Sequence, residues 1–199
     1  MTSADLTGKL VLVDFWAYSC INCQRAIEHV DAWYRAYRDD GLVVIGVHTP
    51  EYAFEHDKGN VKAGAARLHI ACPVALDNDY DTWDAFGNTS WPASYLVDAT
   101  GEVRHVAIGE GGYSGDETLI RQLLSAARPV VALPEATEVP DRTPTDPYQT
   151  PETYLGSDRA QGVANGSLRA GTHAFTLPLP LPLPLRCRRT SSDSAVRGR

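Results

Sequence analysis

The segment KLVLVDFWAYSCINCQRAIEHV, residues Lys9–Val30, joins two different hydrophobic patterns across a pair of cysteines. Lys9–Trp16 is apolar almost throughout and rich in β-branched residues, which is typical of a strand buried on both faces. Over Ile21–Asp40 the apolar side chains recur at helical spacing, with the charged residues mostly on other faces. Cys20 and Cys23 therefore lie where a buried strand is predicted to lead into a helix.

The sequence that follows continues this alternation of strands and helices. Gly41 is well placed to end the first helix, and Leu42–Val47 reads as a second buried strand. Strand, helix and strand in this order favour a parallel pair with a right-handed crossover. The other predicted elements are a loop leading into a helix at Pro50–Leu68, a short strand at Pro73–Leu76, a short helix at Asp79–Phe86, strands at Ala93–Val97 and Glu102–Ile108 joined by a turn at Asp98–Gly101, and a last helix at Asp116–Ala127. This order predicts an α/β domain.

The composition changes near Arg128. Over Pro129–Pro151, prolines recur among Thr, Asp and Glu, which is a linker composition, so we predict one ordered domain over residues 1–133. Leu177–Leu185 alternates leucine and proline; because each proline removes an amide donor, this pattern favours polyproline II. The last residues are basic and typical of a disordered tail. Residues 134–199 are therefore predicted to form a Pro-rich linker and a disordered C-terminal tail.

Charge and hydropathy argue against several classes of protein. The formal net charge is −7 and no basic stripe is visible, which argues against a nucleic-acid partner. No transmembrane segment is expected, since no stretch approaches the ~20 apolar residues that span a membrane. The N-terminus, MTSADLTGKL, lacks the layout of a signal peptide, so a cytoplasmic location is expected if the sequence is complete. Four cysteines are too few for a disulfide scaffold in 199 residues.

The spacing of Cys20 and Cys23 suits a redox-active disulfide. Such a bond needs Cα atoms about 4.4–6.8 Å apart, which two intervening residues at a helix start provide. The free amides and partial positive charge of the helix N-terminus stabilise a thiolate. Cys20, at the N-cap, is expected to be the more exposed thiol and the one that attacks. Cys23, inside the first turn, is expected to face inward and to resolve the mixed disulfide.

Two other interpretations of the pair are a structural zinc site and two inert core thiols. Structural zinc would be indicated by a second C-x-x-C motif, whereas Cys72 and Cys187 are isolated and no nearby histidine completes a compact ligand pair. Cys72 is expected to be a small buried residue, and Cys187 has no visible partner. A redox pair is favoured over both alternatives, with no metal and no cofactor besides its own disulfide.

Asp14 lies inside the apolar strand, where an acid is costly unless it is paired or neutral. One interpretation is an acid that is hydrogen-bonded at the strand end. The other is a buried carboxyl behind the cysteines, which exchanges a proton with Cys23 as the disulfide opens.

The stretch VLVDFWAYSCINC resembles the strand and active site of thioredoxin, with Asp14 at the buried-acid position and Trp16 at the aromatic position before the cysteines. YSCINCQR at Tyr18–Arg25, with GVHTPE at Gly46–Glu51, is similar to DipZ-type thioredoxin-like proteins and to the wider TlpA/ResA group of the redoxin superfamily. The resemblance covers roughly residues 8–130. It implies a thioredoxin-like fold, with a central mixed sheet flanked by helices, and disulfide exchange with protein partners.

The same resemblance implies roles for residues far from the cysteines. Pro92, after Trp91, matches the cis-proline that faces the cysteine pair and helps to hold the substrate backbone; the alternative is an ordinary trans proline at a strand start. Glu51 is expected to tune the acidity of the pair or, alternatively, to be a solvated residue in a helix turn. The same two interpretations apply to His48.

In the DipZ-type family the domain is attached to a CcdA-like membrane electron carrier, which implies an extracytoplasmic, membrane-associated location. No CcdA-like segment is present in this sequence. Pro151–Ala160 resembles the start of a carbohydrate-binding-module-like domain, after which the likeness stops. We expect a truncated carbohydrate-binding-module-like segment there, and a truncated or frame-disrupted gene product is one hypothesis for both ends.

The sequence thus predicts a thiol-disulfide oxidoreductase, acting as a reductase fed by a CcdA-like carrier. Cys20 is the predicted nucleophile, Cys23 the resolving thiol and Asp14 the proton relay. One alternative is a thiol peroxidase of the redoxin superfamily, although such enzymes place their cysteine in a Pro-x-x-x-Thr-x-x-Cys setting and Tyr18 and Ser19 stand here. The other is an inactive or metal-binding fragment of the same fold.

Overall fold

The computed structural model describes residues 2–127 and 132–145. A compact unit runs over Met1–Pro144, and a second unit covers Thr145–Arg199. The Leu-Pro repeats, the expected carbohydrate-binding-module-like segment, the basic tail and Cys187 lie outside the described residues. The elements of the first unit are α1 (Ser3–Leu6), β1 (Leu10–Trp16), α2 (Ile21–Tyr37), η1 (Arg38–Asp40), β2 (Leu42–His48), η2 (Ala53–His56), α3 (Lys58–Arg67), β3 (Val74–Leu76), α4 (Asp81–Ala85), β4 (Ala93–Val97), β5 (Val103–Ile108) and α5 (Tyr113–Ala127).

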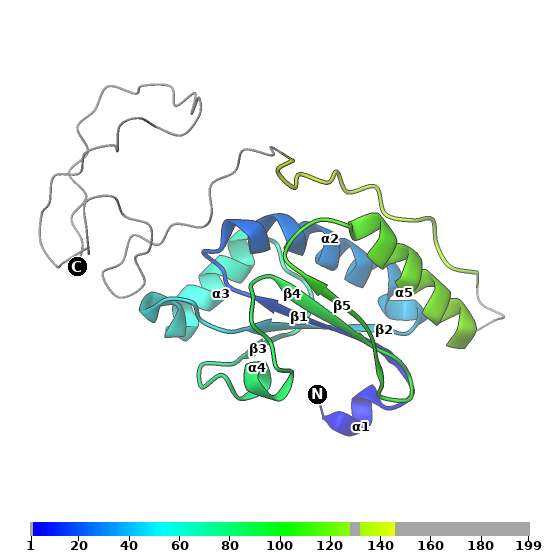
Figure 1. Cartoon of the computed structure of the whole chain (residues 1–199), viewed down its shortest axis with the longest axis horizontal. Helices are drawn as coiled ribbons and strands as arrows, with labels where there is room; N and C mark the ends of the chain where they lie inside the picture. Colours follow the sequence, from blue (N-terminus) through cyan, green and yellow to red (C-terminus); the bar gives the residue numbers. More distant parts are fainter. Residues whose placement is uncertain (1, 128–131, 146–199) are drawn as a thin grey trace, which may run out of the picture. The chain divides into compact units, whose positions relative to one another are not determined.

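Within the described residues the strands form one five-stranded sheet in the order β3-β2-β1-β4-β5 (Figure 1). β1 pairs in parallel with β2, and β2 in parallel with β3. β4 runs antiparallel to both β1 and β5, so the sheet is mixed, as predicted. The parallel strands end at one edge of the sheet, and β4 begins at that edge because its Ala93 pairs with Phe15 near the end of β1.

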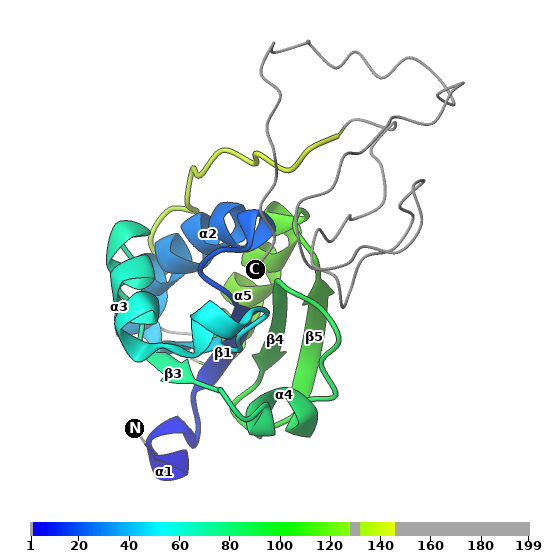
Figure 2. The same cartoon turned by 90° about the vertical axis from the view of Figure 1, so that its left-hand side faces the viewer.

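Helices cover both faces of the sheet. Helices α2, α3 and α5 lie on one face, and α4 lies on the other (Figure 1, Figure 2). Every residue of β1 is buried, and its side chains alternate between two clusters. Leu10 and Leu12 pack with α2 and α5, whereas Val11, Val13 and Phe15 pack on the opposite side with residues of α4.

The predicted strands and helices are confirmed, with small differences at their ends. Gly41, with a φ of 107°, ends the first helical segment, as expected of a residue that tolerates the left-handed region. α5 begins at Tyr113 rather than at the predicted Asp116, because the positive φ of Gly111 and Gly112 turns the chain into the helix earlier. α1 has no counterpart in the prediction.

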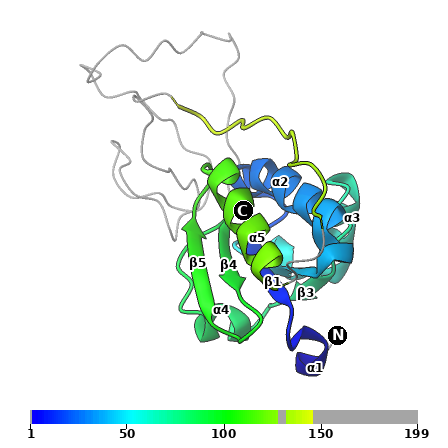
Figure 3. The same ribbon diagram turned by 90° about the vertical axis from the view of Figure 1, so that its right-hand side faces the viewer.

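The compact unit extends to Pro144, past the boundary predicted at Leu133. Leu133 packs against the core cluster to which α2 and α5 contribute. Beyond it, Thr137 donates through its amide and hydroxyl to the buried Glu117 of α5, and Arg142 pairs with Glu28 of α2 at 3.0 Å. Figure 3 shows this segment running past the two helices, which lie side by side.

Candidate active site

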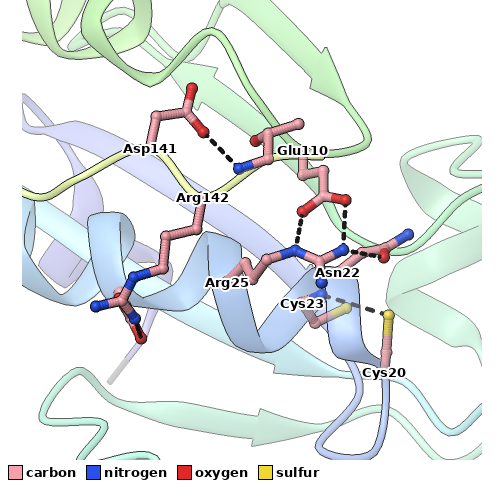
Figure 4. A network of polar contacts seen from close by, with 9 residues as sticks. Cys20, Asn22, Cys23, Arg25, Glu110, Asp141 and Arg142 are labelled. Carbon is pink, nitrogen blue, oxygen red and sulfur yellow. Dashed lines mark hydrogen bonds and ion pairs between the residues drawn. The ribbon is translucent and has the colours of Figure 1, made fainter. Parts of the chain in front are cut away.

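Cys20 and Cys23 meet at the N-terminus of α2. Cys20 is the N-cap residue, and its sulfur accepts the backbone N–H of Cys23 at 3.4 Å (Figure 4). Both are free thiols in this structure. Cys20 is partly exposed, whereas Cys23 is only 1% exposed, which is the predicted arrangement. Ile21, between them, is 59% exposed, so the approach to Cys20 is lined by an apolar side chain.

The two thiols differ in acidity. A hydrogen bond from the Cys23 thiol, together with the backbone amides of the helix start, lowers the pKa of Cys20. Burial raises the pKa of Cys23 well above its ordinary value, and the neighbouring Cys20 adds to this rise. Cys20 therefore becomes the thiolate first, while Cys23 keeps its proton.

Asp14 lies on β1, close enough to Cys23 for its charge to act on that thiol. It is 3% exposed, and burial raises the pKa of its carboxyl to about 7. The negative charge of Asp14 is one contribution, smaller than that of burial, to the raised pKa of Cys23. Asp14, Pro92 and Ser94 line a cavity of about 20 Å³ together with Ala26 of α2. A carboxyl with a pKa near neutrality can take up or release a proton at physiological pH.

The Trp91–Pro92 peptide bond is cis, as the resemblance implied. Pro92 directly precedes β4, at the edge of the sheet where β1 leads to the cysteines. Its carbonyl accepts the N–H of Gly109 at 2.9 Å, and the Trp91 indole donates to the Thr49 carbonyl at 3.0 Å. Two neighbouring loops thus hold this turn in place.

Glu55 is the buried acid beside the cysteine loop, and the sequence reasoning did not identify it. It is fully buried in η2, and its carboxylate accepts the Ser19 amide at 3.2 Å and the Ser19 hydroxyl at 2.7 Å. The same carboxylate accepts the amides of Glu51 and Tyr52 at 2.6 and 3.0 Å. Ser19 directly precedes Cys20, so Glu55 fixes the chain next to Cys20. Glu51, which the sequence predicted as a tuning residue, has a negative charge that raises the pKa of Cys20. This contribution is smaller than those of the hydrogen bonds to the Cys20 sulfur and of burial.

His48 supports the same loop from the end of β2. It is fully buried, its Nε2 accepts the Tyr18 amide at 3.3 Å, and its ring stacks on the Tyr18 ring. Burial lowers the pKa of His48, which keeps the ring neutral and able to accept that hydrogen bond. His48 is therefore a structural support for the loop before Cys20.

A second polar cluster connects the cysteine segment with the loop after β5. Arg25 of α2 holds Glu110 through two hydrogen bonds of 2.6 Å and donates to the side-chain oxygen of Asn22 at 2.8 Å (Figure 4). Asn22 is one of the two residues between the cysteines. The side chains of Arg25 and Glu110 are 22% and 13% exposed, so the pair is largely shielded from water.

Cys72, a metal site and a membrane-spanning helix are the remaining features that the sequence analysis considered. Cys72 is buried, and burial raises the pKa of its thiol to about 12, which makes it an inert apolar residue as predicted. In the part of the chain that the structure describes, no three His, Cys, Asp or Glu side chains are grouped so that they could hold a metal ion. None of the helices described there is long and apolar enough to cross a membrane.

Comparison with known proteins agrees with this fold. The model of the AhpC/TSA family matches residues 1–106. Protein DipZ from Mycobacterium tuberculosis is 56% identical over 87% of the chain, which covers 25% of DipZ. Thiol-disulfide oxidoreductase YkuV from Bacillus subtilis is 35% identical over 63% of the chain and 84% of YkuV. The chain thus spans about a quarter of the length of the DipZ relatives. Because the similarity covers 87% of the chain, it extends past residue 133 and is longer than the resemblance over residues 8–130 that the sequence indicated.

Solved structures show the same fold. The solution structure of an oxidised thioredoxin-like protein has a TM-score of 0.58, 35% identity and coverage of 63% of this chain and 85% of that one. The thioredoxin-like superfamily protein SPOA0173 has a TM-score of 0.57, 25% identity and coverage of 67% and 88%. Fold and relatives together define a thioredoxin-like thiol-disulfide oxidoreductase. The chain belongs to the AhpC/TSA family, and it is a DipZ-like thioredoxin-like domain.

Proposed function

We propose that Cys20 and Cys23 are the redox centre, and that they reduce disulfides of protein partners. The observation that carries this proposal is the contrast between the two thiols: one is a partly exposed N-cap sulfur with a lowered pKa, and the other is a buried sulfur with a raised pKa. This contrast assigns attack to Cys20 and resolution to Cys23.

The reaction proceeds in two exchanges. The Cys20 thiolate attacks one sulfur of the partner's disulfide, a Cys20–partner bond forms, and the other partner sulfur leaves as a thiolate that is protonated from water. Cys23 then loses its proton and attacks the Cys20 sulfur. The Cys20–Cys23 disulfide forms, and the second partner sulfur leaves. The pair gives up two electrons, and the partner's disulfide becomes two thiols.

Asp14 is the proposed acceptor of the Cys23 proton. Cys23 must be deprotonated in a site that water reaches poorly. Asp14 is buried there, and burial raises the pKa of its carboxyl to about 7, so this group can accept a proton near neutral pH. The charge interaction between Asp14 and Cys23 supports their proximity. When the disulfide is reduced again, the same carboxyl returns the proton.

Trp91 and Pro92 are the proposed substrate-facing turn, and Glu51 is a proposed minor tuning charge. The cis turn lies at the sheet edge that carries the cysteines, where an extended partner segment could lie against it. Glu51 acts on the pKa of Cys20 but is outweighed by the hydrogen bonds to the sulfur.

The electrons for each new cycle are proposed to come from a CcdA-like membrane carrier, with the domain on the outer side of the membrane. The similarity to Protein DipZ and the YSCINCQR segment support this donor. The reductase direction has a direct test in the reduction potential: a value near about −270 mV agrees with a reductase, and a value near about −120 mV with an oxidant that inserts disulfides.

Reduction of insulin by dithiothreitol tests the activity. Wild-type protein should accelerate the reaction, and Cys20→Ser should abolish the acceleration. Insulin reduction that persists in Cys20→Ser would refute the assignment. Rapid consumption of hydrogen peroxide, with no insulin reduction, would favour the thiol peroxidase instead, and stoichiometric zinc or copper in the purified protein would favour a metal-binding fragment.

A further inference from the structure

The ion pair between Arg25 and Glu110 brings a positive charge to the cysteine segment and neutralises it there. Arg25 lies in the second turn of α2, and its guanidinium fork meets both oxygens of the Glu110 carboxylate at 2.6 Å. Its remaining contact is to Asn22, in the dipeptide between the cysteines. A two-bond pair of this kind fixes the direction of the guanidinium as well as its charge.

Glu110 is positioned by the backbone around it. Gly109 and Gly111 flank it with φ values of 82° and 99°, which only glycine adopts readily. The Gly109 amide donates to the carbonyl of Pro92, so the loop that carries Glu110 is tied to the cis turn. The ion pair therefore joins the two sides of the site, the start of α2 and the loops after β5 and before β4.

Arg25 and Cys20 interact through their charges. The hydrogen bond to Glu110 is the main cause that raises the pKa of Arg25, and the negative charge of Cys20 acts in the same direction. The interaction is mutual, because a cation that is stabilised by a thiolate also stabilises that thiolate. The charge of Glu51 acts on Cys20 in the opposite sense and raises its pKa, and the Glu55 carboxylate accepts the amide of the neighbouring Ser19.

We propose that Glu110 is a positioning residue that holds and neutralises the Arg25 guanidinium, and that this ion pair sets the reduction potential of the Cys20–Cys23 centre. With Glu110 in place, Arg25 stabilises the Cys20 thiolate only weakly. Without Glu110, the uncompensated cation would stabilise the thiolate, favour the reduced form and make the pair more oxidising. Without Arg25, the uncompensated Glu110 would do the reverse.

This inference rests on the proposed redox role of the pair, and it predicts shifts of opposite sign. Glu110→Gln should shift the redox equilibrium between the Cys20–Cys23 pair and glutathione at pH 7 towards the dithiol form, by a factor of at least about three in the equilibrium constant. This factor corresponds to a reduction potential that is higher by about 15 mV. Arg25→Met should change the constant about as much towards the disulfide. The double variant should return close to wild type. Damage to the fold, by contrast, would not give two opposite shifts that cancel.

The measurement is the fraction of alkylated Cys20 and Cys23 after acid quenching, across a series of glutathione ratios, by mass spectrometry. Trypsin digestion of the wild-type protein yields both cysteines in one peptide, because trypsin cleaves after Lys9 and after Arg25. The matched control is the exposed pair Arg104–Glu102, 3.4 Å apart on β5 and the turn before it. Arg104→Met and Glu102→Gln make the same charge changes away from the cysteines and should leave the potential unchanged.

Each result bears on the inference. Opposite shifts that cancel in the double variant support it. Single-variant shifts of the same sign, or no shift, in proteins with wild-type thermal unfolding would overturn it and leave the redox role intact. If Glu110→Gln loses its fold, a second readout is the pH midpoint of Cys20 alkylation in Arg25→Lys, which keeps the charge and should stay below that of Arg25→Met; equal midpoints would overturn the inference. If Arg25→Met loses its fold, the shift of Glu110→Gln decides, and no shift towards the dithiol form would overturn the inference. A wild-type protein without a two-electron transition would overturn the proposed function as well.

Discussion

The buried carboxyl of Asp14 makes the stability of this domain depend on pH in an unusual direction. Its pKa is about 7 in the folded protein, against 3.8 as the ordinary value, so the folded state binds this proton more tightly than the unfolded chain does. Between about pH 4 and pH 7 the folded state therefore carries more protons at this site, and the contribution of Asp14 to stability falls as the pH rises. Asp14 is fully buried, so solvent screening does not discount this effect.

The expected magnitude follows from the size of the shift. A pKa difference of about three units corresponds to about 4 kcal/mol, at 1.36 kcal/mol for each unit. Asp14→Asn removes the charge and keeps the shape of the side chain. We expect the free energy of unfolding of this variant, minus that of the wild type, to increase by about 4 kcal/mol from pH 4 to pH 8.

Urea unfolding of the reduced proteins at a series of pH values measures this difference. Titration of the other acids and histidines is common to both proteins and cancels in the subtraction. Asp84→Asn, which changes an exposed acid of α4, is the matched control and should show a constant difference from wild type. Parallel pH profiles for Asp14→Asn and wild type would refute the claim that Asp14 is a buried acid with a raised pKa.

Three further predictions concern the thiols and the loop before them. Glu55→Ala should lower the free energy of unfolding by at least about 2 kcal/mol in chemical denaturation, because it removes a fully buried carboxylate and the part-buried hydrogen bonds that it accepts from Ser19; an unchanged stability would show that the carboxylate does not hold the loop. Iodoacetamide should alkylate Cys20 with a midpoint below about pH 8.5, the ordinary thiol value, and a midpoint above it would contradict the lowered pKa. Cys72 should resist alkylation until the protein is unfolded; labelling at the rate of Cys20 in native protein would show that it is not buried.

The local features of the site could be predicted from the sequence because neighbouring residues determine them. The N-cap position of Cys20, the burial of Cys23 and the burial of Asp14 all follow from one apolar strand that leads into one amphipathic helix. The cis bond before Pro92 was predicted from the resemblance alone. Periodicity and composition carry no information about that bond.

The long-range contacts could not be predicted in this way. Glu55 is 36 residues from Ser19, and the sequence around it resembles an ordinary helix turn. Arg25 and Glu110 are 85 residues apart, so their pairing depends on how the loop after β5 meets α2. The predicted domain boundary at Leu133 rested on composition. Composition does not show that Thr137 and Arg142 find partners on the helices.

Trapping of the mixed disulfide tests the central claim, that Cys20 attacks and Cys23 resolves, most directly. Reduced Cys23→Ser and Cys20→Ser proteins are each mixed with oxidised insulin and analysed on a non-reducing gel, and the linked cysteine is identified by mass spectrometry. We predict that Cys23→Ser accumulates a covalent adduct through Cys20, because no resolving thiol is left, and that Cys20→Ser forms no adduct through Cys23, which is buried and protonated. An adduct through Cys23, or no adduct through Cys20, would contradict the assigned roles.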